Sequence, residues 1–218
     1  MKILAIDGAL GGFSAALAAG SDIVAARYET GNVALEKGLA MVREVLVQAQ
    51  MEATALDRLA VGIGPGGFTG LRIAIAYAKS LALAWGLPLV PVSSFDVLEY
   101  GRQFDRVLTI VVGRPGVISA RFRDGSATRR ASGLTLEVLA ETLPAGRAPL
   151  AVVGASKDVL AALAERGTDV QSFDPLVTPA AAATALAAAS RAPAPSAHQV
   201  RADYGELPAA KVPKLDRR

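Results

Sequence analysis

The first thirty residues begin with a continuous apolar run of the buried-strand type at 2–7 and continue with two further short apolar-rich runs, with glycine-rich breaks between them. This pattern is typical of three short strands joined by tight turns. The spacing then becomes helical, because Leu35, Leu39, Val42 and Leu46 repeat at intervals of four, three and four residues. Gly38 lies inside this helix at a cost of about 1 kcal/mol relative to Ala, which favours a close backbone approach there. The predicted elements are strands at 2–7, 13–19 and 22–29 and a helix over 34–50.

Strand and helix patterns alternate through the rest of the chain. A strand at 58–63 runs into a glycine-rich loop, and the next helix, 71–85, has Thr69 as its expected N-cap. Three strands, one helix and then alternating elements indicate an α/β fold with a division near residue 105. We therefore predict an N-terminal subdomain over 1–105, a C-terminal α/β subdomain over 106–190 and a Pro-rich basic tail over 191–218. Further strands are expected at 87–92, 106–113, 116–124 and 150–153, and further helices at 94–104, 135–142, 156–166 and 179–190.

The charge of the chain is concentrated at its end. Lys and Arg number 23 against 20 Asp and Glu, for a net charge of +3. The last eight residues, 211–218, hold four basic groups and one acid, so the surplus is a property of the tail. The longest uncharged runs, 80–95 and 175–190, are 16 residues each and contain prolines or polar groups. A membrane span needs roughly 20 apolar residues, and no signal peptide is evident, so a soluble cytoplasmic protein is expected.

The rarest residue types exclude several kinds of site. Cysteine is absent and His198 is the single histidine. Disulfides, thiolate zinc sites, two-histidine metal sites and most Ser-His triads are therefore excluded. We expect no catalytic residue and no metal ligand in this chain, and we expect His198 to be a solvated tail residue.

The glycine-rich loop satisfies a nucleotide-binding pattern in form alone. Residues 62–67 read GxGxxG between a strand and a helix. A dinucleotide site also needs an acid at the end of the next strand, and that strand ends at Ser93 without one. A phosphate-binding loop of the Walker type needs a Lys-Ser/Thr pair, which does not follow Gly70. The loop is better interpreted as a glycine turn that packs closely and starts a helix.

Asp7 at the end of the first strand has two interpretations. It could hold Mg²⁺ through water while the glycine turn after it meets a phosphate, which makes Asp7, Gly8 and Gly12 weak candidates for cofactor binding. The favoured alternative is that Asp7 ends its strand and accepts a hydrogen bond from its own turn. Two arginine clusters also have two interpretations. Their side chains could contact phosphate groups, or they could lie at the solvated edge of a strand, and the second interpretation is favoured. The clusters are Arg121 with Arg123, and Arg129 with Arg130.

Residues 64–73, Gly-Pro-Gly-Gly-Phe-Thr-Gly-Leu-Arg-Ile, resemble the GPGSFTGLRIG signature of the TsaB (YeaZ) family. The resemblance extends over residues 1–100, through segments 2–7, 77–82 and 91–98, and is loose beyond them, as at Val200-Arg201. It departs from the family at Asp7-Gly8-Ala9, at Ala34 and Leu35 in the first helix, and at Gly67 in place of the loop serine. The signature-loop residues carried over are Gly64, Pro65, Gly66, Phe68, Thr69 and Gly70.

This resemblance implies an actin-like ATPase (ASKHA, ribonuclease H-like) fold of two α/β subdomains with a degenerate nucleotide site. It also implies a non-catalytic scaffold for a TsaD-like transferase, which forms the threonylcarbamoyl group on the adenosine next to the tRNA anticodon. A TsaE-like ATPase would be a further partner, and tRNA would be met indirectly or through the basic tail. No intrinsic cofactor is expected, with ATP or ADP at the partner interface left open, and a homodimer is expected when the partner is absent.

In the family, the two helices at 34–50 and 70–85 pair with helices of TsaD. The partner interface expected here comprises Leu39, Val42, Leu46, Ile73 and Tyr77, with Glu36 and Arg72 at its polar margin. Two alternatives remain open. One is a standalone ATPase or sugar-kinase-like enzyme that uses Asp7, and the other is an RNA-binding module that uses the tail and the arginine clusters.

Overall fold

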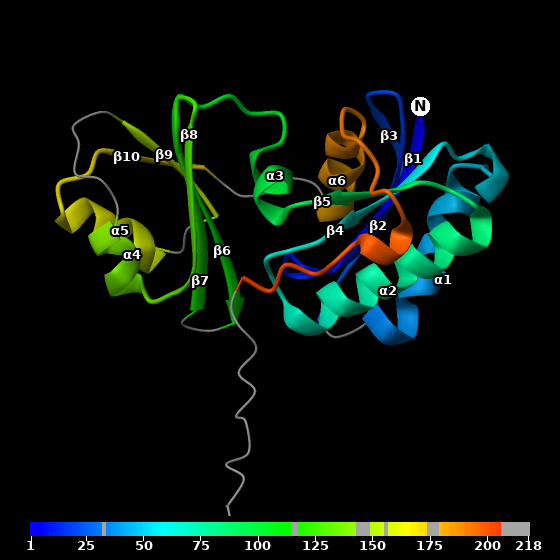
Figure 1. Cartoon of the computed structure of the whole chain (residues 1–218), viewed down its shortest axis with the longest axis horizontal. Helices are drawn as coiled ribbons and strands as arrows, with labels where there is room; N and C mark the ends of the chain where they lie inside the picture. Colours follow the sequence, from blue (N-terminus) through cyan, green and yellow to red (C-terminus); the bar gives the residue numbers. More distant parts are fainter. Residues whose placement is uncertain (32–33, 115–116, 143–148, 155–156, 174–178, 206–218) are drawn as a thin grey trace, which may run out of the picture.

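The computed structural model describes residues 1–31, 34–114, 117–142, 149–154, 157–173 and 179–205. Its described strands form two five-stranded sheets that lie side by side (Figure 1). In the first sheet β1, β2 and β3 are antiparallel neighbours, and β4 and β5 extend it parallel to β1. The strand order is β3-β2-β1-β4-β5. The bounds are β1 (Lys2–Asp7), β2 (Gly12–Ala19), β3 (Asp22–Thr30), β4 (Arg58–Gly62) and β5 (Leu89–Val92).

The second sheet repeats this connectivity. Read from its far edge, its order is β8-β7-β6-β9-β10, with three antiparallel strands followed by two parallel ones. Two α/β units of one topology are the expected actin-like ATPase arrangement, so the predicted fold class is confirmed. The bounds are β6 (Arg106–Arg114), β7 (Val117–Asp124), β8 (Ala127–Leu134), β9 (Leu150–Val153) and β10 (Val170–Phe173).

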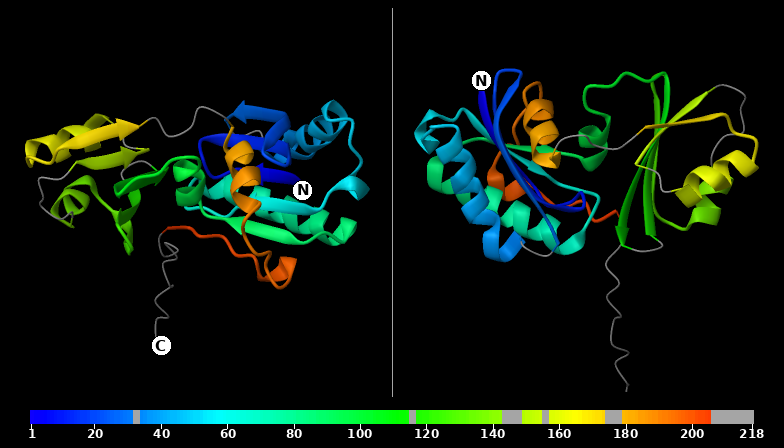
Figure 2. Two further views of the ribbon diagram at one scale, coloured as in Figure 1. Left: turned by 90° about the horizontal axis from the view of Figure 1, so that it is seen from above. Right: turned by 180° about the vertical axis from the view of Figure 1, so that it is seen from behind.

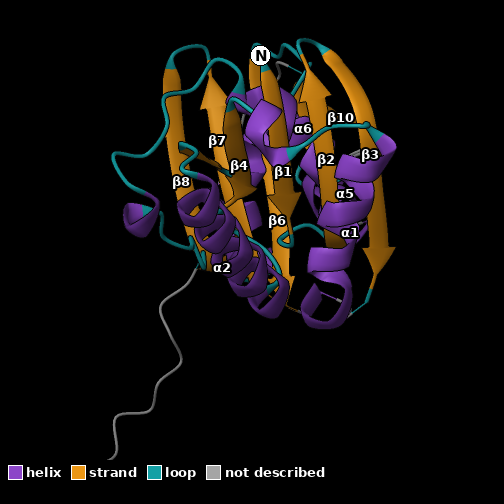
Figure 3. Ribbon diagram, turned by 90° about the vertical axis from the view of Figure 1, so that its right-hand side faces the viewer, coloured by secondary structure: helices purple, strands orange, loops and turns teal. Residues whose placement is uncertain are grey.

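Helices cover both faces of the first sheet because its central strand is apolar on both sides. Leu4 and Ile6 of β1 face a core shared with α1 (Ala34–Gln48) and α2 (Phe68–Trp85), which lie side by side (Figure 3). Ile3 and Ala5 point to the opposite face, against α6 (Ala180–Ala188). Eight of the nine residues of α6 are buried, and seven of these are alanines, so the helix lies close to the sheet.

The remaining helices belong to the second sheet or lie between the sheets. α4 (Leu136–Thr142) and α5 (Lys157–Glu165) pack on the face of the second sheet that points away from the first (Figure 2). α3 (Ser94–Glu99) lies between the two sheets, and Ser93 caps it by accepting a hydrogen bond from the Phe95 N–H at 3.3 Å. Short 3-10 turns occur at η1 (Ala53–Ala55) and η2 (Ala197–Gln199). No described helix is both long and apolar enough to cross a membrane.

Several predicted elements need correction. β8 and β10 were not expected, because β8 has no buried face and β10 is short, so neither shows strand alternation. α2 begins at Phe68 with Gly67 at the N-cap, one turn before the start predicted with Thr69 as the cap. α3 ends at Glu99, and the chain then runs irregularly to β6.

The chain also returns to the first sheet near its C-terminus, which the sequence did not predict. Residues 180–188 form α6 on that sheet, although the sequence assigned them to the C-terminal subdomain. Residues 191–205 are not an extended tail but run beside α2 toward β7 (Figure 1). The Ala194 N–H donates to the Leu89 carbonyl at 2.9 Å, and the Asp203 N–H donates to the Ile63 carbonyl at 2.7 Å. The basic residues at 211–218 lie outside the described residues.

Candidate functional site

The glycines of the signature loop provide close backbone packing. The Gly67 N–H donates to the Ala9 carbonyl at 2.8 Å, which joins the loop to the turn after β1. A Cβ on Gly66 would lie 2.2 Å from the Ala9 oxygen, and one on Gly8 would lie 2.3 Å from the Gly70 oxygen. No side chain fits at those distances, so the interpretation of the loop as a tightly packed turn is confirmed.

The signature loop also holds the C-terminal segment. Gly64 has φ +94°, and a Cβ there would lie 2.3 Å from the Asp203 carbonyl oxygen. The Arg72 guanidinium lies 3.8 Å from the Phe68 ring centroid, and its Nε donates to the Tyr204 hydroxyl at 3.0 Å. Arg72 therefore already has partners within the chain, and its place at the margin of a partner interface stays a prediction.

Asp7 is buried at the end of β1. Its Oδ1 accepts a hydrogen bond from the Ala9 N–H at 2.9 Å, and its Oδ2 accepts one from the Thr184 hydroxyl of α6 at 3.3 Å. Burial raises the pKa of the Asp7 carboxyl to about 6, against the lowering effect of these hydrogen bonds. Gly62 leaves room for the carboxylate, since a Cβ there would lie 1.9 Å from Oδ2. The favoured interpretation, that Asp7 closes its own turn, is confirmed.

A glycine-lined pocket of about 300 Å³ lies beside this turn and the start of α2. Gly8 and Gly12 line it, but Asp7 does not, and its lining contains no charged side chain. Among the described residues, no group of three or more His, Cys, Asp or Glu is arranged to hold a metal ion. A magnesium-bound nucleotide needs oxygen ligands for the metal. The residues that line this pocket do not fit that requirement, because none of them is a carboxylate. We name this hollow the glycine pocket; Gly11, Gly31, Ala34, Gly67, Phe68, Thr69, Gly70 and Ile73 also line it.

The buried face of α1 packs against α2 and β2. A Cβ on Gly38 would lie 2.7 Å from Tyr77 Cε2 and 2.9 Å from Phe13 Cζ, so the predicted close approach at Gly38 is confirmed. Val42 belongs to this buried face, with 3% of its surface exposed, so its placement in a partner interface is wrong. The apolar stripe of α1 is broad, and the chain's own core uses the Val42 side of it.

The other side of the apolar stripe is exposed. Leu39 is 49% exposed, while Leu46, Ile73 and Tyr77 are half-buried beside it. Tyr77 joins the two helices, because its hydroxyl donates to the Leu35 carbonyl at 2.9 Å. Periodicity placed Leu35 on the helix but not on this surface, because it does not show which edge of a stripe is left uncovered. Val47 lies roughly 80° further round α1 than Leu39, outside the repeat, so periodicity passed over it. We name Leu35, Leu39 and Val47 the exposed α1 positions; Leu35 is 70% and Val47 68% exposed.

Glu36 and Arg72, the residues predicted at the polar margin, are both exposed. Glu36 lies on α1 beside the exposed α1 positions, in the first turn of the helix. Six of the seven predicted interface residues thus lie on α1 and α2 with part of their surface exposed. The seventh, Val42, is buried.

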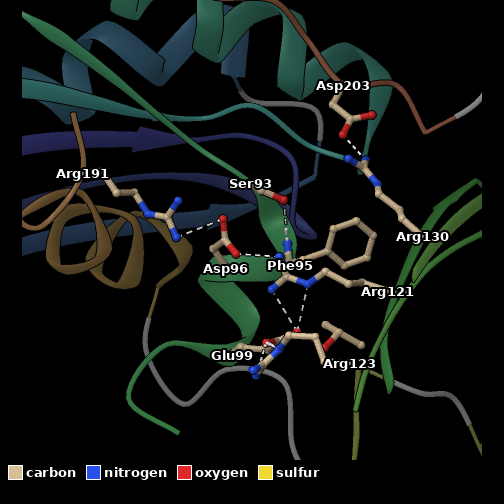
Figure 4. A network of polar contacts seen from close by, with 10 residues as sticks. Ser93, Phe95, Asp96, Glu99, Arg121, Arg123, Arg130, Arg191 and Asp203 are labelled. Atoms are coloured by element: carbon tan, nitrogen blue, oxygen red, sulfur yellow. Dashed lines mark hydrogen bonds and ion pairs between the residues drawn. The ribbon is translucent and has the colours of Figure 1, made fainter. Parts of the chain in front are cut away.

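A network of ion pairs connects α3 to the second sheet (Figure 4). Arg121 of β7 contacts Asp96 at 2.6 Å and Glu99 at 2.9 Å, and Arg123 contacts Glu99 at 2.8 Å. Arg191, which follows α6, contacts Asp96 at 3.0 Å. Arg121 and Arg123 are therefore neither free for phosphate nor a solvated strand edge, and both sequence interpretations of this pair are wrong. In the second cluster, Arg130 pairs with Asp203, and Arg129 is exposed on β8.

The fold and the site define a class of protein. The chain has the two-unit fold of actin-like ATPases, with a glycine pocket that lacks charged lining groups and an apolar helix surface beside it. Residues 35–193, well over half of the chain, match the family described as "TsaD: tRNA N6-adenosine threonylcarbamoyltransferase". With the TsaB and YeaZ relatives described next, this match shows that the chain belongs to the TsaB (YeaZ) family, within the wider family that the TsaD description covers.

Relatives of known name agree over part of their length. The chain is 34% identical over 122 residues to "tRNA threonylcarbamoyladenosine biosynthesis protein TsaB" of Escherichia coli, which covers 54% of this chain and 53% of that protein. It is 36% identical over 74 residues to the protein of the same name in Bacillus subtilis, covering 34% of this chain and 32% of the relative. The matches therefore span about half or less of these curated relatives.

A solved structure agrees over nearly the whole chain. The structure titled "YeaZ from Pseudomonas aeruginosa" superposes with a TM-score of 0.71 and 26% identity, covering 93% of this chain and 99% of that one. A second Pseudomonas aeruginosa structure, described as similar to peptidase YEAZ, gives a TM-score of 0.76 at 26% identity, covering 94% and 99%. The similarity thus includes the second sheet, where the sequence resemblance is weak.

Proposed function

We propose that this protein takes part in the biosynthesis of threonylcarbamoyladenosine in tRNA as a non-catalytic scaffold for a TsaD-like transferase. Membership of the TsaB family carries this proposal, because relatives named for that biosynthesis match the chain. The protein would not transfer the threonylcarbamoyl group itself, and the reaction would occur on the partner.

The exposed α1 positions support a protein partner on this surface. Several large apolar side chains that are about half or more exposed along one helix are typical of an interaction surface. The proposed interface comprises Leu35, Leu39 and Val47 of α1, with the half-buried Leu46, Ile73 and Tyr77 beside them. A partner helix would pack along the two helices, as in a helical bundle.

Nucleotide, ATPase and tRNA have indirect roles in this proposal. The described residues that line the glycine pocket include no carboxylate, which favours ATP or ADP at the junction with the partner over a site of the chain's own. A TsaE-like ATPase would join the assembly, and tRNA would be bound by the assembly or through the basic tail. A second copy of the chain would cover the same helices when the partner is absent.

The test measures the affinity of purified variants for a TsaD-like protein by calorimetry. Leu39→Glu and Val47→Glu each place a charge on the proposed interface, and each is expected to weaken binding at least about tenfold, or 1.4 kcal/mol. The matched control is Val138→Glu on α4, a half-exposed apolar helix position on the second sheet. The control should bind like the wild type.

Circular dichroism should show that all three variants stay folded, because their side chains are at least 42% exposed. Unchanged partner affinity in both Leu39→Glu and Val47→Glu would contradict the proposed interface. The alternative of a standalone kinase is not favoured, because Asp7 is buried away from the glycine pocket.

A further inference from the structure

A second pocket, of about 610 Å³, lies at the amino ends of three parallel strands of the second sheet. It is on the face opposite α4 and α5, which points toward α3 and the first sheet (Figure 1). Its volume falls within the range typical of small-molecule sites. We name it the second-sheet pocket; it is lined by Arg102, Gln103, Phe104, Asp105, Arg106, Pro149, Ala151, Gln171 and Phe173.

The walls of the second-sheet pocket combine aromatic and polar groups. Phe104 and Phe173 form an edge-to-face pair with ring centroids 5.1 Å apart. Gln103 and Gln171 are exposed, and their amides can donate or accept hydrogen bonds at the mouth. Flat apolar walls with a few polar groups are the usual composition of a site for a small organic molecule.

Arg102 gives this pocket its chemical preference. Its guanidinium lies 5.8 Å from the Phe173 ring centroid, and its Nη1 is buried without a hydrogen-bond partner in the part of the chain that the structure describes. A buried cationic nitrogen without an acceptor is costly, and native proteins rarely leave one unpaired. Arg102 as a whole is half-buried, so its side chain lines a pocket of ligand size while Nη1 lies beneath the surface without an acceptor.

The other charged groups of the second-sheet pocket do not neutralise Arg102. Arg106 pairs with Asp124 through an Nε to Oδ2 contact of 3.2 Å. Asp105 is exposed and, among the described residues, forms no ion pair with Arg102, so the Arg102 guanidinium has no direct counter-charge in this pocket. A guanidinium matches a carboxylate or a phosphate, because it donates two parallel hydrogen bonds.

We propose that the second-sheet pocket binds a small organic anion, a carboxylate or phosphate carried on a flat apolar group. The anion accepts hydrogen bonds from Arg102, and the apolar group lies against Phe104 and Phe173. This site is separate from α1, α2 and the glycine pocket, and it does not depend on the proposed scaffold function.

The experiment titrates the full-length protein with benzoate and with phenyl phosphate, using benzamide as the uncharged probe, and follows backbone amide shifts by NMR. Shifts should appear at Gln103 and Gln171 with at least one anion and be much weaker with benzamide. Binding of benzoate alone identifies a carboxylate site, and binding of phenyl phosphate alone identifies a phosphate site. Either result supports the proposal.

Variants test the role of Arg102. Arg102→Met keeps the apolar stem beside Phe173 and should lower anion affinity at least about tenfold without loss of thermal stability. Arg102→Lys keeps the charge but not the paired donors and should give an intermediate affinity. Arg129→Met, an exposed position on β8, should bind as the wild type does.

Three results would overturn the proposal. The first is the absence of shifts in the wild type with both anions, and the second is shifts that map to the glycine pocket instead. The third is equal anion affinity in wild type, Arg102→Met and Arg102→Lys, whatever their stability.

Discussion

Asp7 has a structural role at the buried end of β1. Its carboxylate accepts hydrogen bonds from its own turn and from Thr184 of α6, 177 residues later in the chain. The same turn also accepts a hydrogen bond, from the Gly67 N–H of the signature loop to the Ala9 carbonyl. Asp7 thus connects α6, the first turn and the signature loop, and this role requires no nucleotide.

The raised pKa of Asp7 makes a pH prediction. A carboxyl whose pKa rises from 3.8 to about 6 on folding stabilises the fold at pH below 3.8, and this contribution is lost as the pH rises through 6. The free energy of unfolding of Asp7→Asn, relative to that of the wild type, should therefore increase by roughly 2–2.5 kcal/mol between pH 4 and pH 7. Urea unfolding across this range measures it.

The exposed Asp22→Asn variant serves as the control, and its unfolding free energy should follow the wild-type pH profile. A constant difference between Asp7→Asn and wild type from pH 4 to pH 7 would show that the burial of Asp7 does not set its charge state. Asn can accept from the Ala9 N–H and donate to Thr184, so the fold of the variant should be kept.

Residue by residue, the sequence predicted local contacts better than distant ones. The Asp7 turn could be expected, because an Asp at a strand end commonly accepts from the backbone two residues on. The partners of Arg121 and Arg123 could not, because Asp96 and Glu99 lie more than twenty residues away on another element. Thr184 was out of reach for the same reason.

At the scale of elements, the contact between α1 and α2 depends on Gly38. Replacing Gly by Ala inside a helix normally stabilises it by about 1 kcal/mol. Gly38→Ala should instead destabilise the protein by roughly 1–3 kcal/mol, because the new Cβ would meet the Tyr77 and Phe13 rings. Chemical denaturation measures the difference.

Ala40→Gly, at an exposed position of the same helix, is the matched control and should cost about 1 kcal/mol through helix propensity alone. A gain of stability in Gly38→Ala would mean that α1 and α2 are farther apart than described. The same variant should also alter the interface formed by the exposed α1 positions.

Element prediction succeeded for strands that are apolar and buried and failed for a strand that is exposed. β1 and β9 begin and end where predicted, since both are apolar strands between clear breaks. β8 is exposed along nearly its whole length, so no apolar repeat identifies it. Val42 was misplaced because the apolar repeat of α1 includes positions that the core of the chain buries as well as positions that stay exposed.

At the scale of the whole molecule, the two α/β units are joined by charge. Glu99 is 8% exposed and contacts Arg121 and Arg123. Removing one member of such a buried pair leaves unmatched charge, so Glu99→Gln should lower the free energy of unfolding by about 3 kcal/mol. Urea denaturation measures this loss.

Glu44→Gln is the control, because Glu44 forms an exposed ion pair with Arg27 at 3.3 Å and should cost less than about 1 kcal/mol. Equal losses in both variants would show that the network at α3 adds no more than a surface pair. The position of α6 on the first sheet, and the path of residues 191–205 from that sheet to β7, were not predictable, since they depend on contacts between residues far apart in the chain.

The most direct test of the scaffold account is the rate of threonylcarbamoyl transfer to tRNA by a TsaD-like enzyme, titrated with this protein. The account predicts no transfer by this protein alone, a rate that rises until the two proteins are equimolar, and loss of that rise with Leu39→Glu but not with Val138→Glu. Transfer catalysed by this protein alone, or equal stimulation by Leu39→Glu and wild type, would contradict it.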